Sequence, residues 1–227
     1  MLRHQRTLEL ADFDRESLCR IQDSRVLVVG AGGLGSVVLP LLAAQEVGAI
    51  CVVDSDCVEE SNLPRQTLYT EQDIGCAKAE LAALRLRALN PRGRVDGNVV
   101  RVDAGWLESR QSLPDLVIDC TDNFATRGLL DSYCGAHSLP LVWGAVEGYT
   151  GQLSLLHGKR QISLRDIFGE LPASRPLSNG VFAPLVHMVG AIMSSIALRW
   201  LAFGASELDG RLWQCDARSG ATQIFEL

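Results

Sequence analysis

The sequence predicts an α/β fold: a doubly wound, Rossmann-like and mainly parallel sheet with helices on both faces and an antiparallel C-terminal extension. Three observations favour it. Short β-branched runs are typical of strands buried on both faces, and a glycine-rich turn joins the first such run to an apolar helical pattern. Strand and helix patterns then alternate as far as residue 157.

The glycine-rich turn is the best defined of these features. Val26 to Val29 form a strand pattern, and glycines follow at once with the spacing G-x-G-x-x-G: Gly30, Gly32 and Gly35, with Gly33 between them. A second strand pattern, Ile50 to Val53, ends at Asp54, where a ribose-binding acid belongs. Glycine lets the backbone approach a phosphate, and a helix N-terminus offers N–H groups to it. A glycine turn without a ligand is the alternative, but the ordered succession of strand, turn, helix, strand and acid favours nucleotide binding.

The remaining elements follow in chain order. A helix capped by Asp14 precedes the first strand, and Asn90-Pro91 ends a later one, because the residue before proline disfavours the α region. We expect helices over 78–89, 106–111, 123–137 and 181–203, and strands over 95–102, 116–120, 139–143, 151–157, 211–216 and 222–226.

We interpret residues 1–227 as one domain in four parts. These are an N-terminal arm and helix (1–24), a nucleotide-binding core (25–157), a mobile loop with a helical turn (158–180), and an interface helix with C-terminal strands (181–227). Residues 181–203 are apolar enough to raise a membrane span, but Pro184, His187 and Arg199 disfavour a lipid-facing helix. A helix buried in the core or at a subunit interface is the better interpretation.

Composition narrows the class of protein. The 227 residues are 47% hydrophobic and 21% charged, as in an ordinary globular protein. The formal net charge of −6 argues against nucleic acid as the main partner. No basic, then apolar, leader pattern opens the sequence, and the seven cysteines include no C-x-x-C pair. We therefore expect a cytoplasmic protein with reduced thiols and no membrane partner.

Polar residues at the predicted carboxyl edge of the sheet point to a triphosphate. Arg65 and Lys78 would add two cations there, which suits ATP better than the pyrophosphate of NAD. Asp122 follows the strand at 116–120 and offers a carboxylate for Mg²⁺, and Asn62 offers a neutral donor and acceptor. Each has an ordinary alternative, namely a surface ion pair, a helix face or a helix cap. Together they predict a site for ATP with Mg²⁺.

At these residues the chain resembles the ThiF/MoeB/HesA adenylyltransferases, bacterial relatives of ubiquitin-activating enzymes. The matching segments are Arg-His-Gln-Arg at 3–6, Gly-Ala-Gly-Gly-Leu-Gly at 30–35, Asp54-Ser-Asp56, Ser61-Asn-Leu-Pro-Arg-Gln66, Lys78, Asp119-Cys-Thr-Asp-Asn123, and Gly180-Val-Phe-Ala-Pro before the apolar helix. The resemblance covers nearly the whole chain.

The resemblance implies adenylation of the C-terminal Gly-Gly carboxylate of a small ubiquitin-like sulfur-carrier protein. It implies that the glycine loop and Asp54 hold the nucleotide, with Asp54 on the ribose, and that Asn62, Arg65 and Lys78 hold the phosphates. Asp56, Gln66 and Asn123 belong to the same nucleotide-binding set, and Asp122 is the magnesium ligand. Arg6 resembles an arginine that crosses from the other subunit of a homodimer to the triphosphate.

Two departures from the family pattern stand out. Many relatives hold a structural zinc with two C-x-x-C pairs, whereas here the first region is His157-Gly-Lys-Arg-Gln-Ile and the second pair is absent. Relatives that form a covalent intermediate carry a cysteine at the position of Pro176. We therefore expect no zinc site, and adenylation without covalent acyl or sulfur transfer.

Three other functions stay open at this point. They are an NAD-dependent oxidoreductase, a tRNA-modifying relative that adenylates RNA, and a family member kept only as a dimeric scaffold. The acidic balance weighs against the second. The retention of Arg6, Arg65, Lys78 and Asp122 together weighs against the third.

Overall fold

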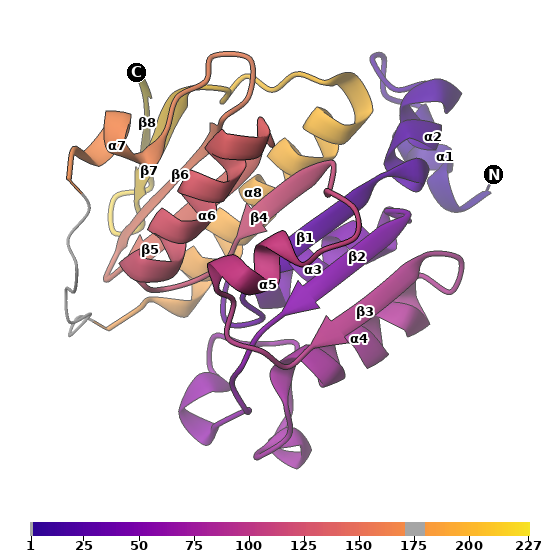
Figure 1. Ribbon diagram of the computed structural model, residues 1–227, viewed down its shortest axis with the longest axis vertical. Coiled ribbons are helices and arrows are strands. Elements are labelled where there is room, and N and C mark those ends of the chain that lie inside the picture. The colour runs from indigo at the N-terminus through magenta and orange to yellow at the C-terminus, as the bar shows by residue number, and fades with distance from the viewer. Residues whose placement is uncertain (1, 171–179) are drawn as a thin grey trace.

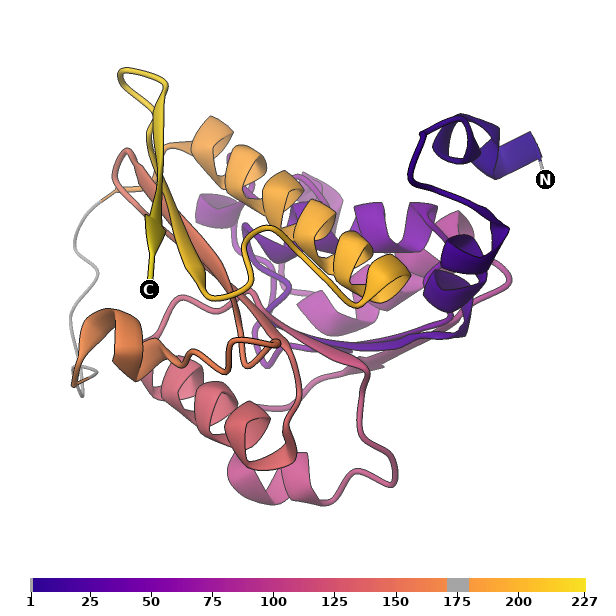
Figure 2. The same ribbon diagram turned by 90° about the horizontal axis from the view of Figure 1, so that it is seen from above.

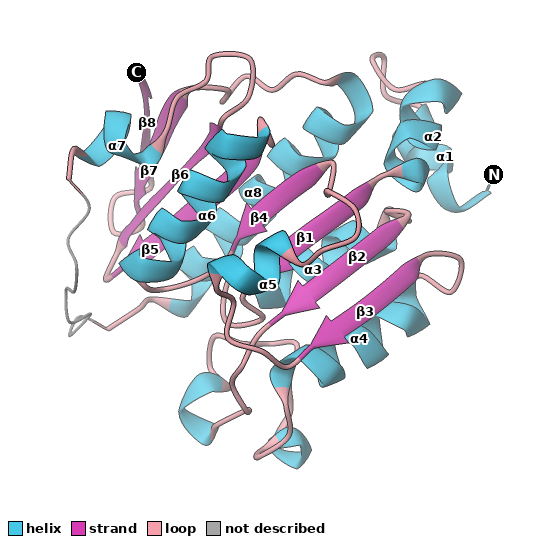
Figure 3. Ribbon diagram, viewed as in Figure 1, coloured by secondary structure: helices cyan, strands magenta, loops and turns pink. Residues whose placement is uncertain are grey.

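The sheet has eight strands in the order β3-β2-β1-β4-β5-β6-β7-β8 (Figure 3). The computed structural model describes residues 2–170 and 180–227. The strands are β1 Arg25–Val29, β2 Ala49–Val53, β3 Arg94–Asn98, β4 Leu116–Asp119, β5 Leu141–Glu147, β6 Thr150–Leu156, β7 Arg211–Asp216 and β8 Ala221–Glu226. The first five are parallel and the last three antiparallel, so the predicted fold class is confirmed.

Helices cover both faces of this sheet, as Figures 1 and 2 show from two directions. They are α1 Gln5–Leu8, α2 Arg15–Asp23, α3 Gly35–Ala44, α4 Lys78–Leu89, α5 Ala104–Glu108, α6 Phe124–His137, α7 Leu164–Phe168 and α8 Ala183–Phe203. Short 3₁₀ turns occur at η1 Leu2–His4, η2 Glu60–Asn62 and η3 Glu71–Asp73. The predicted cap of α2 is present, since the Asp14 side chain accepts the Ser17 N–H at 2.8 Å.

Alternation along the buried strands builds two cores. In β1, Val26 and Val28 join the core beneath α3, α4 and α8, while Leu27 and Val29 join the core beneath α5, α6 and α7. Both faces of β1 are therefore fully covered, and its carboxyl end is fixed in the middle of the molecule.

By length and composition alone, helix α8 is long and apolar enough to cross a membrane. Half of its most apolar 18-residue stretch is buried in the protein. Val189 and Met193 are fully buried against the sheet. The prediction of a core helix is thus confirmed for one face of α8. Its other face is exposed and carries Pro184, Met188, Ala191 and Ser195.

Several element boundaries differ from those expected. Strand β3 stops at Asn98, not 102, because its partner β2 ends at Val53, which pairs with Asn98. Strand β5 runs past Trp143 to Glu147, because β6 continues to pair with it as far as the turn. Helix α5 begins at Ala104, where the Asp103 side chain accepts the Trp106 N–H at 2.7 Å.

The segment expected to be a loop with a helical turn contains α7, which is that turn. Residues 171–179, including Pro176, lie outside the described residues. The predicted mobility of this segment stays a prediction.

Candidate functional site

The glycine loop lies between the carboxyl ends of β1 and β4, where the strand order reverses. Strand β1 pairs with β2 on one side and β4 on the other, and open α/β sheets bind ligands at this switch point. Gly30 has φ +96°, and a Cβ there would lie 2.7 Å from the Cys120 carbonyl oxygen. A Cβ at Gly35 would lie 2.3 Å from the Gly30 carbonyl oxygen. Only glycine at both positions lets α3 begin this close to the sheet.

Asp54 ties the end of β2 to this loop. Its Oδ2 accepts the Ala31 N–H at 2.7 Å, and its Oδ1 accepts the Asp56 N–H at 2.8 Å. Burial raises the pKa of Asp54, although both N–H donors and the charge of Lys78 oppose the rise. A carboxylate has about four acceptor positions, so Asp54 can still accept hydrogen bonds from ribose hydroxyls.

Lys78 brings a cation to the same edge. Its side chain is only 7% exposed, and Nζ lies 3.4 Å from Asp56 Oδ2. Lys78 is also the first residue of α4, and in the described chain neither α4 nor α3 has a side-chain hydrogen bond at its N-cap. Two helix N-termini without side-chain caps therefore accompany a buried ammonium, an arrangement that favours a bound phosphate.

The segment from η2 to Gln66 lies against the glycine loop. Asn62 is buried and its Oδ1 accepts the Glu59 N–H at 3.3 Å, while Arg65 Nη1 donates to the Ser61 carbonyl at 2.9 Å. Gln66 is 4% exposed, and its buried Oε1 has no partner among the described residues. A Cβ on Gly32 would lie 3.4 Å from Gln66 Nε2. The Gln66 side chain therefore lies directly against the glycine loop.

Tyr69 is a residue of this site that the sequence patterns do not single out. Its buried hydroxyl donates to the Ala31 carbonyl at 2.8 Å and lies 3.3 Å from the Lys78 carbonyl. Burial raises the pKa of Tyr69, so the hydroxyl remains a donor at neutral pH. Tyr69 thus joins the glycine loop to the start of α4. No local motif marks it, because its partners lie 38 and 9 residues away.

The predicted metal ligand lies at the end of β4. Asp122 is exposed, and the next residue, Asn123, caps α6 by accepting the Thr126 N–H at 2.9 Å. Just before them, Asp119 is fully buried, and its Oδ1 accepts both the N–H and the hydroxyl of Thr121. Burial raises the pKa of Asp119, while the charge of Arg127 and the Thr121 hydrogen bonds lower it.

Arg127 completes the support of this turn. It is buried, its Nη2 donates to the Thr121 carbonyl at 3.0 Å, and its guanidinium lies over the Phe124 and Trp143 rings. Asp119 and Arg127 therefore hold the backbone that presents Asp122. The sequence patterns assign no role to either residue; the signals for Asp119 are its polar side chain inside the apolar run 116–120 and its place in the matched segment 119–123.

Arg6 lies far from the candidate site of its own chain. Its side chain is 92% exposed and pairs with Glu9 at 2.9 Å on the N-terminal arm. In Figure 1 the arm lies beside α2 at the amino ends of the parallel strands, opposite the glycine loop. The structure therefore gathers the glycine loop with Asp54, Asp56, Asn62, Arg65, Gln66 and Lys78, places Asp122 and Asn123 across the switch point, and leaves Arg6 apart.

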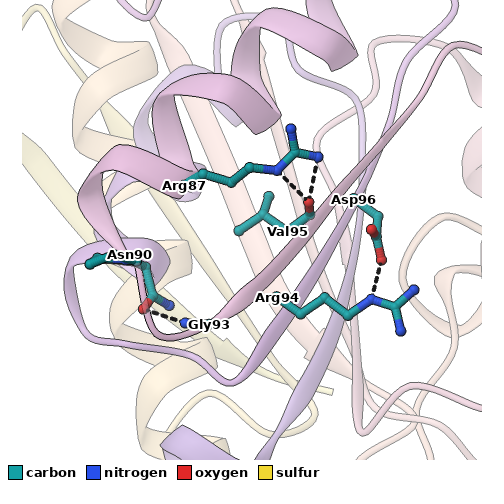
Figure 4. A pocket seen from close by; sticks show the side chains of 7 residues that line it. Arg87, Asn90, Gly93, Arg94, Val95 and Asp96 are labelled. Carbon is teal, nitrogen blue, oxygen red and sulfur yellow. Dashed lines mark hydrogen bonds and ion pairs between the residues drawn. The ribbon is translucent and has the colours of Figure 1, made fainter.

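A pocket of about 510 Å³ also lies at the amino end of the sheet, between α4 and β3 (Figure 4). Its polar groups bond to one another: Arg87 donates to the Val95 carbonyl, Asn90 accepts the Gly93 N–H, and Arg94 pairs with Asp96. This hollow lacks the glycine loop and the helix N-termini, so we place the functional site at the carboxyl edge instead.

The described residues contain no cluster of three or more His, Cys, Asp or Glu side chains arranged for a metal ion. His157, in the region where relatives carry cysteines, is buried, and its Nε2 lies 2.8 Å from Asp131 Oδ1. A single exposed carboxylate such as Asp122 suits Mg²⁺, which keeps water ligands and shares substrate phosphates. The residues present therefore fit ATP with Mg²⁺.

The chain is similar to known proteins over most of its length. The family model described as "ThiF family" matches residues 4–227. The SAMP-activating enzyme E1 of Haloferax volcanii is 38% identical over 95% of this chain and 81% of its own length. For the molybdopterin-synthase adenylyltransferase of Escherichia coli the values are 35%, 96% and 88%.

Solved structures show the same fold. The crystal structure of Escherichia coli MccB with ATP has a TM-score of 0.81 and 17% identity, over 92% of this chain and 66% of that one. The match to MccB with MccA-N7isoASN gives a TM-score of 0.83 at the same coverage. With the family model matched over almost the whole length, this chain belongs to the ThiF family.

Proposed function

We propose that this protein adenylates the C-terminal Gly-Gly carboxylate of a small ubiquitin-like sulfur-carrier protein, using ATP with Mg²⁺ and releasing pyrophosphate. The observation that carries the proposal is the carboxyl edge of the sheet. There, a buried ammonium and two helix N-termini without side-chain caps lie beside a glycine loop and a carboxylate suited to ribose. Named relatives at 35–39% identity are adenylyltransferases of sulfur-carrier proteins or of molybdopterin synthase.

In the proposed reaction a carboxylate oxygen of the carrier attacks the α-phosphorus of ATP. The bond from that phosphorus to the bridging oxygen breaks, pyrophosphate leaves with the electron pair, and an acyl adenylate remains. The residues of this chain would position the two reactants and neutralise the developing charge, which suffices for phosphoryl-type transfer. Lys78 and Arg65 would compensate the charge that develops on the phosphate oxygens, and Asp54 would orient the ribose.

Asp122 would hold the magnesium ion, which would neutralise phosphate charge and polarise the reacting phosphoryl group. The clamp formed by Asp119, Thr121 and Arg127 supports this role, because it fixes the backbone next to Asp122 while leaving that side chain exposed. A fixed backbone limits the conformational entropy lost when the ion binds.

We further propose a homodimer in which each site takes Arg6 from the opposite chain. Two observations support it. Arg6 lies away from the site of its own chain, and α8 exposes a face with the apolar residue Met188 and no charged side chain between Pro184 and Ser195. A two-fold contact along α8 would bury that face.

The shared site is tested with two variants, Arg6→Ala and Asp122→Ala, each expected to be inactive alone. After subunit exchange, mixed dimers hold one intact site and activity should return; continued inactivity after proven exchange would contradict the shared site.

The proposed activity itself is tested by mass spectrometry of a Gly-Gly-ended carrier after incubation with ATP and the enzyme. A carrier mass increased by one AMP group supports adenylation. The matched control is the same carrier without its two terminal glycines, which should not gain mass. An NAD-dependent oxidoreductase would leave both carriers unchanged and bind nicotinamide nucleotide instead. A tRNA-modifying enzyme would transfer AMP to RNA.

A further inference from the structure

Glu46, just after α3, has an unusual backbone and a buried carboxylate. It is 4% exposed, and its φ of +59° lies in the left-handed region that favours glycine. A glutamate there costs conformational energy, and burying its charge adds a desolvation cost. Both costs must be offset by the contacts that the side chain makes.

Those contacts come from three separate segments. Glu46 Oε2 lies 2.7 Å from His4 Nε2 on the N-terminal arm, and it accepts Gln22 Nε2 of α2 at 2.9 Å. Arg3, also on the arm, lies 3.5 Å from Oε1, and Arg92 lies 3.7 Å from it. His4 is itself 4% exposed, so the His4–Glu46 contact is a buried polar pair. Removing one member of such a pair leaves the other buried and uncompensated.

The same arm carries Arg6, two residues after His4. Helix α1 has only four residues, too few to be stable alone, and Arg6 pairs with Glu9 of the same short segment. Beyond the arm, the next long-range side-chain contacts recorded in the described chain are Asp12 with Arg199 and Phe13 with Phe203. Arg3 Nη2 also donates to the Leu89 carbonyl, so this carbonyl helps Glu46 to hold Arg3, whereas His4 is held through Glu46. The direction in which Arg6 projects therefore depends on an anchor at residues 3 and 4 in which Glu46 contacts both. Figure 2 shows this arm standing out from the body beside α2.

We propose that Glu46 is a positioning residue for the site of the opposite subunit: it fixes the arm that delivers Arg6 to the partner's triphosphate. This inference rests on the shared site of the proposed function. Glu46 contacts neither nucleotide nor carrier, and it acts only through the arm of its own chain.

The test is the pattern of complementation. Glu46→Gln keeps the size of the side chain and removes its charge, and activity should fall about 10- to 100-fold because a displaced catalytic group costs that much. Mixed with Asp122→Ala and allowed to exchange, it should regain about a quarter of wild-type activity, since half of the dimers then hold one intact site. Mixed with Arg6→Ala, it should regain nothing, because both damaged arms serve the sites that keep Asp122.

A residue that acted in its own subunit's site would give the reverse pattern, with rescue by Arg6→Ala and not by Asp122→Ala. That pattern, rescue by both or by neither, or full activity of Glu46→Gln would overturn the proposal. The Arg6→Ala and Asp122→Ala pair is run alongside. If that pair fails to complement, the shared site is wrong and the role of Glu46 fails with it, which is a distinguishable result.

Two further variants guard against a folding artefact. His4→Ala removes the same contact from the arm and leaves Glu46 with Gln22, Arg3 and Arg92, so it should give the same complementation pattern. Glu16→Gln removes an exposed ion pair with Arg20 in the same N-terminal region and should retain activity. Hydrogen exchange at residues 5–9 should be faster in Glu46→Gln and unchanged in Glu16→Gln. Unchanged exchange in Glu46→Gln would also contradict the proposal.

Discussion

Substitution of Asp122 by asparagine should reduce activity while leaving the stability of the fold almost unchanged. The side chain is exposed, while the neighbouring turn is held by Asp119 and Arg127. A surface substitution of this kind usually changes stability by no more than about 0.5 kcal/mol. For a domain of this size that corresponds to a shift in Tm of about 1–2 °C. The negative charge of Asp122 also raises the pKa of Asp119, so its removal relieves a repulsion and adds no strain.

The effect on catalysis should be far larger. Losing one group that stabilises charge in the transition state typically costs about 2.7–4 kcal/mol, or about 10²- to 10³-fold in rate. The assay is carrier-dependent pyrophosphate exchange at saturating ATP over a range of Mg²⁺ concentrations, with Tm measured in parallel. The matched control is Asp115→Asn at the other end of β4, which keeps an acceptor for the Arg25 N–H. Exchange by Asp122→Asn within about threefold of wild type would refute the metal assignment.

Three further predictions concern stability and thiol chemistry. Gly35→Ala should lower the free energy of unfolding by about 1–3 kcal/mol, because its Cβ would overlap the Gly30 carbonyl oxygen; urea denaturation measures this, and an unchanged midpoint would contradict it. Burial acts to raise the pKa of Glu46, but contact with His4, Arg3 and Arg92 outweighs burial and holds it below its ordinary 4.5. The ionised Glu46 carboxylate should therefore contribute its full stabilisation above pH 4.5 and lose it as the pH falls through the lower pKa of the folded state. Unfolding curves between about pH 5 and 3 should show this loss, and Glu46→Gln should lack it. Replacement of the exposed Cys19, Cys57 and Cys76 by serine should preserve adenylation, and a covalent carrier adduct on any of these thiols would refute that.

Much of the fold could be predicted because the signals are local. Helix α4 has the predicted bounds, since Asn90-Pro91 ends it, and α2 has the predicted cap at Asp14. The limits of β3 and β5 could not be predicted in this way. Each depends on how far the neighbouring strand continues to pair, and that is a property of the assembled sheet.

The residues of the site likewise differ in how far local sequence signals predict them. The glycine loop and Asp54 follow strand ends in sequence, so their proximity is expected from the geometry of a parallel sheet. Tyr69 and Glu46 act through partners that only tertiary packing brings close: Ala31 lies 38 residues from Tyr69, and His4 lies 42 residues from Glu46. Arg127 bonds to Thr121, six residues earlier, but no motif marks that contact. Their residue types are unremarkable in sequence, and only burial and hydrogen bonding distinguish them.

In the proposed reaction, the terminal carboxylate of a carrier splits ATP between its α- and β-phosphates. Exchange of labelled pyrophosphate into ATP measures that step directly. Exchange should require Mg²⁺ and a Gly-Gly-ended carrier, and it should disappear when the two glycines are removed. Absence of exchange with carriers of this kind under conditions where the protein is folded, or equal exchange without any carrier, would contradict the proposed reaction.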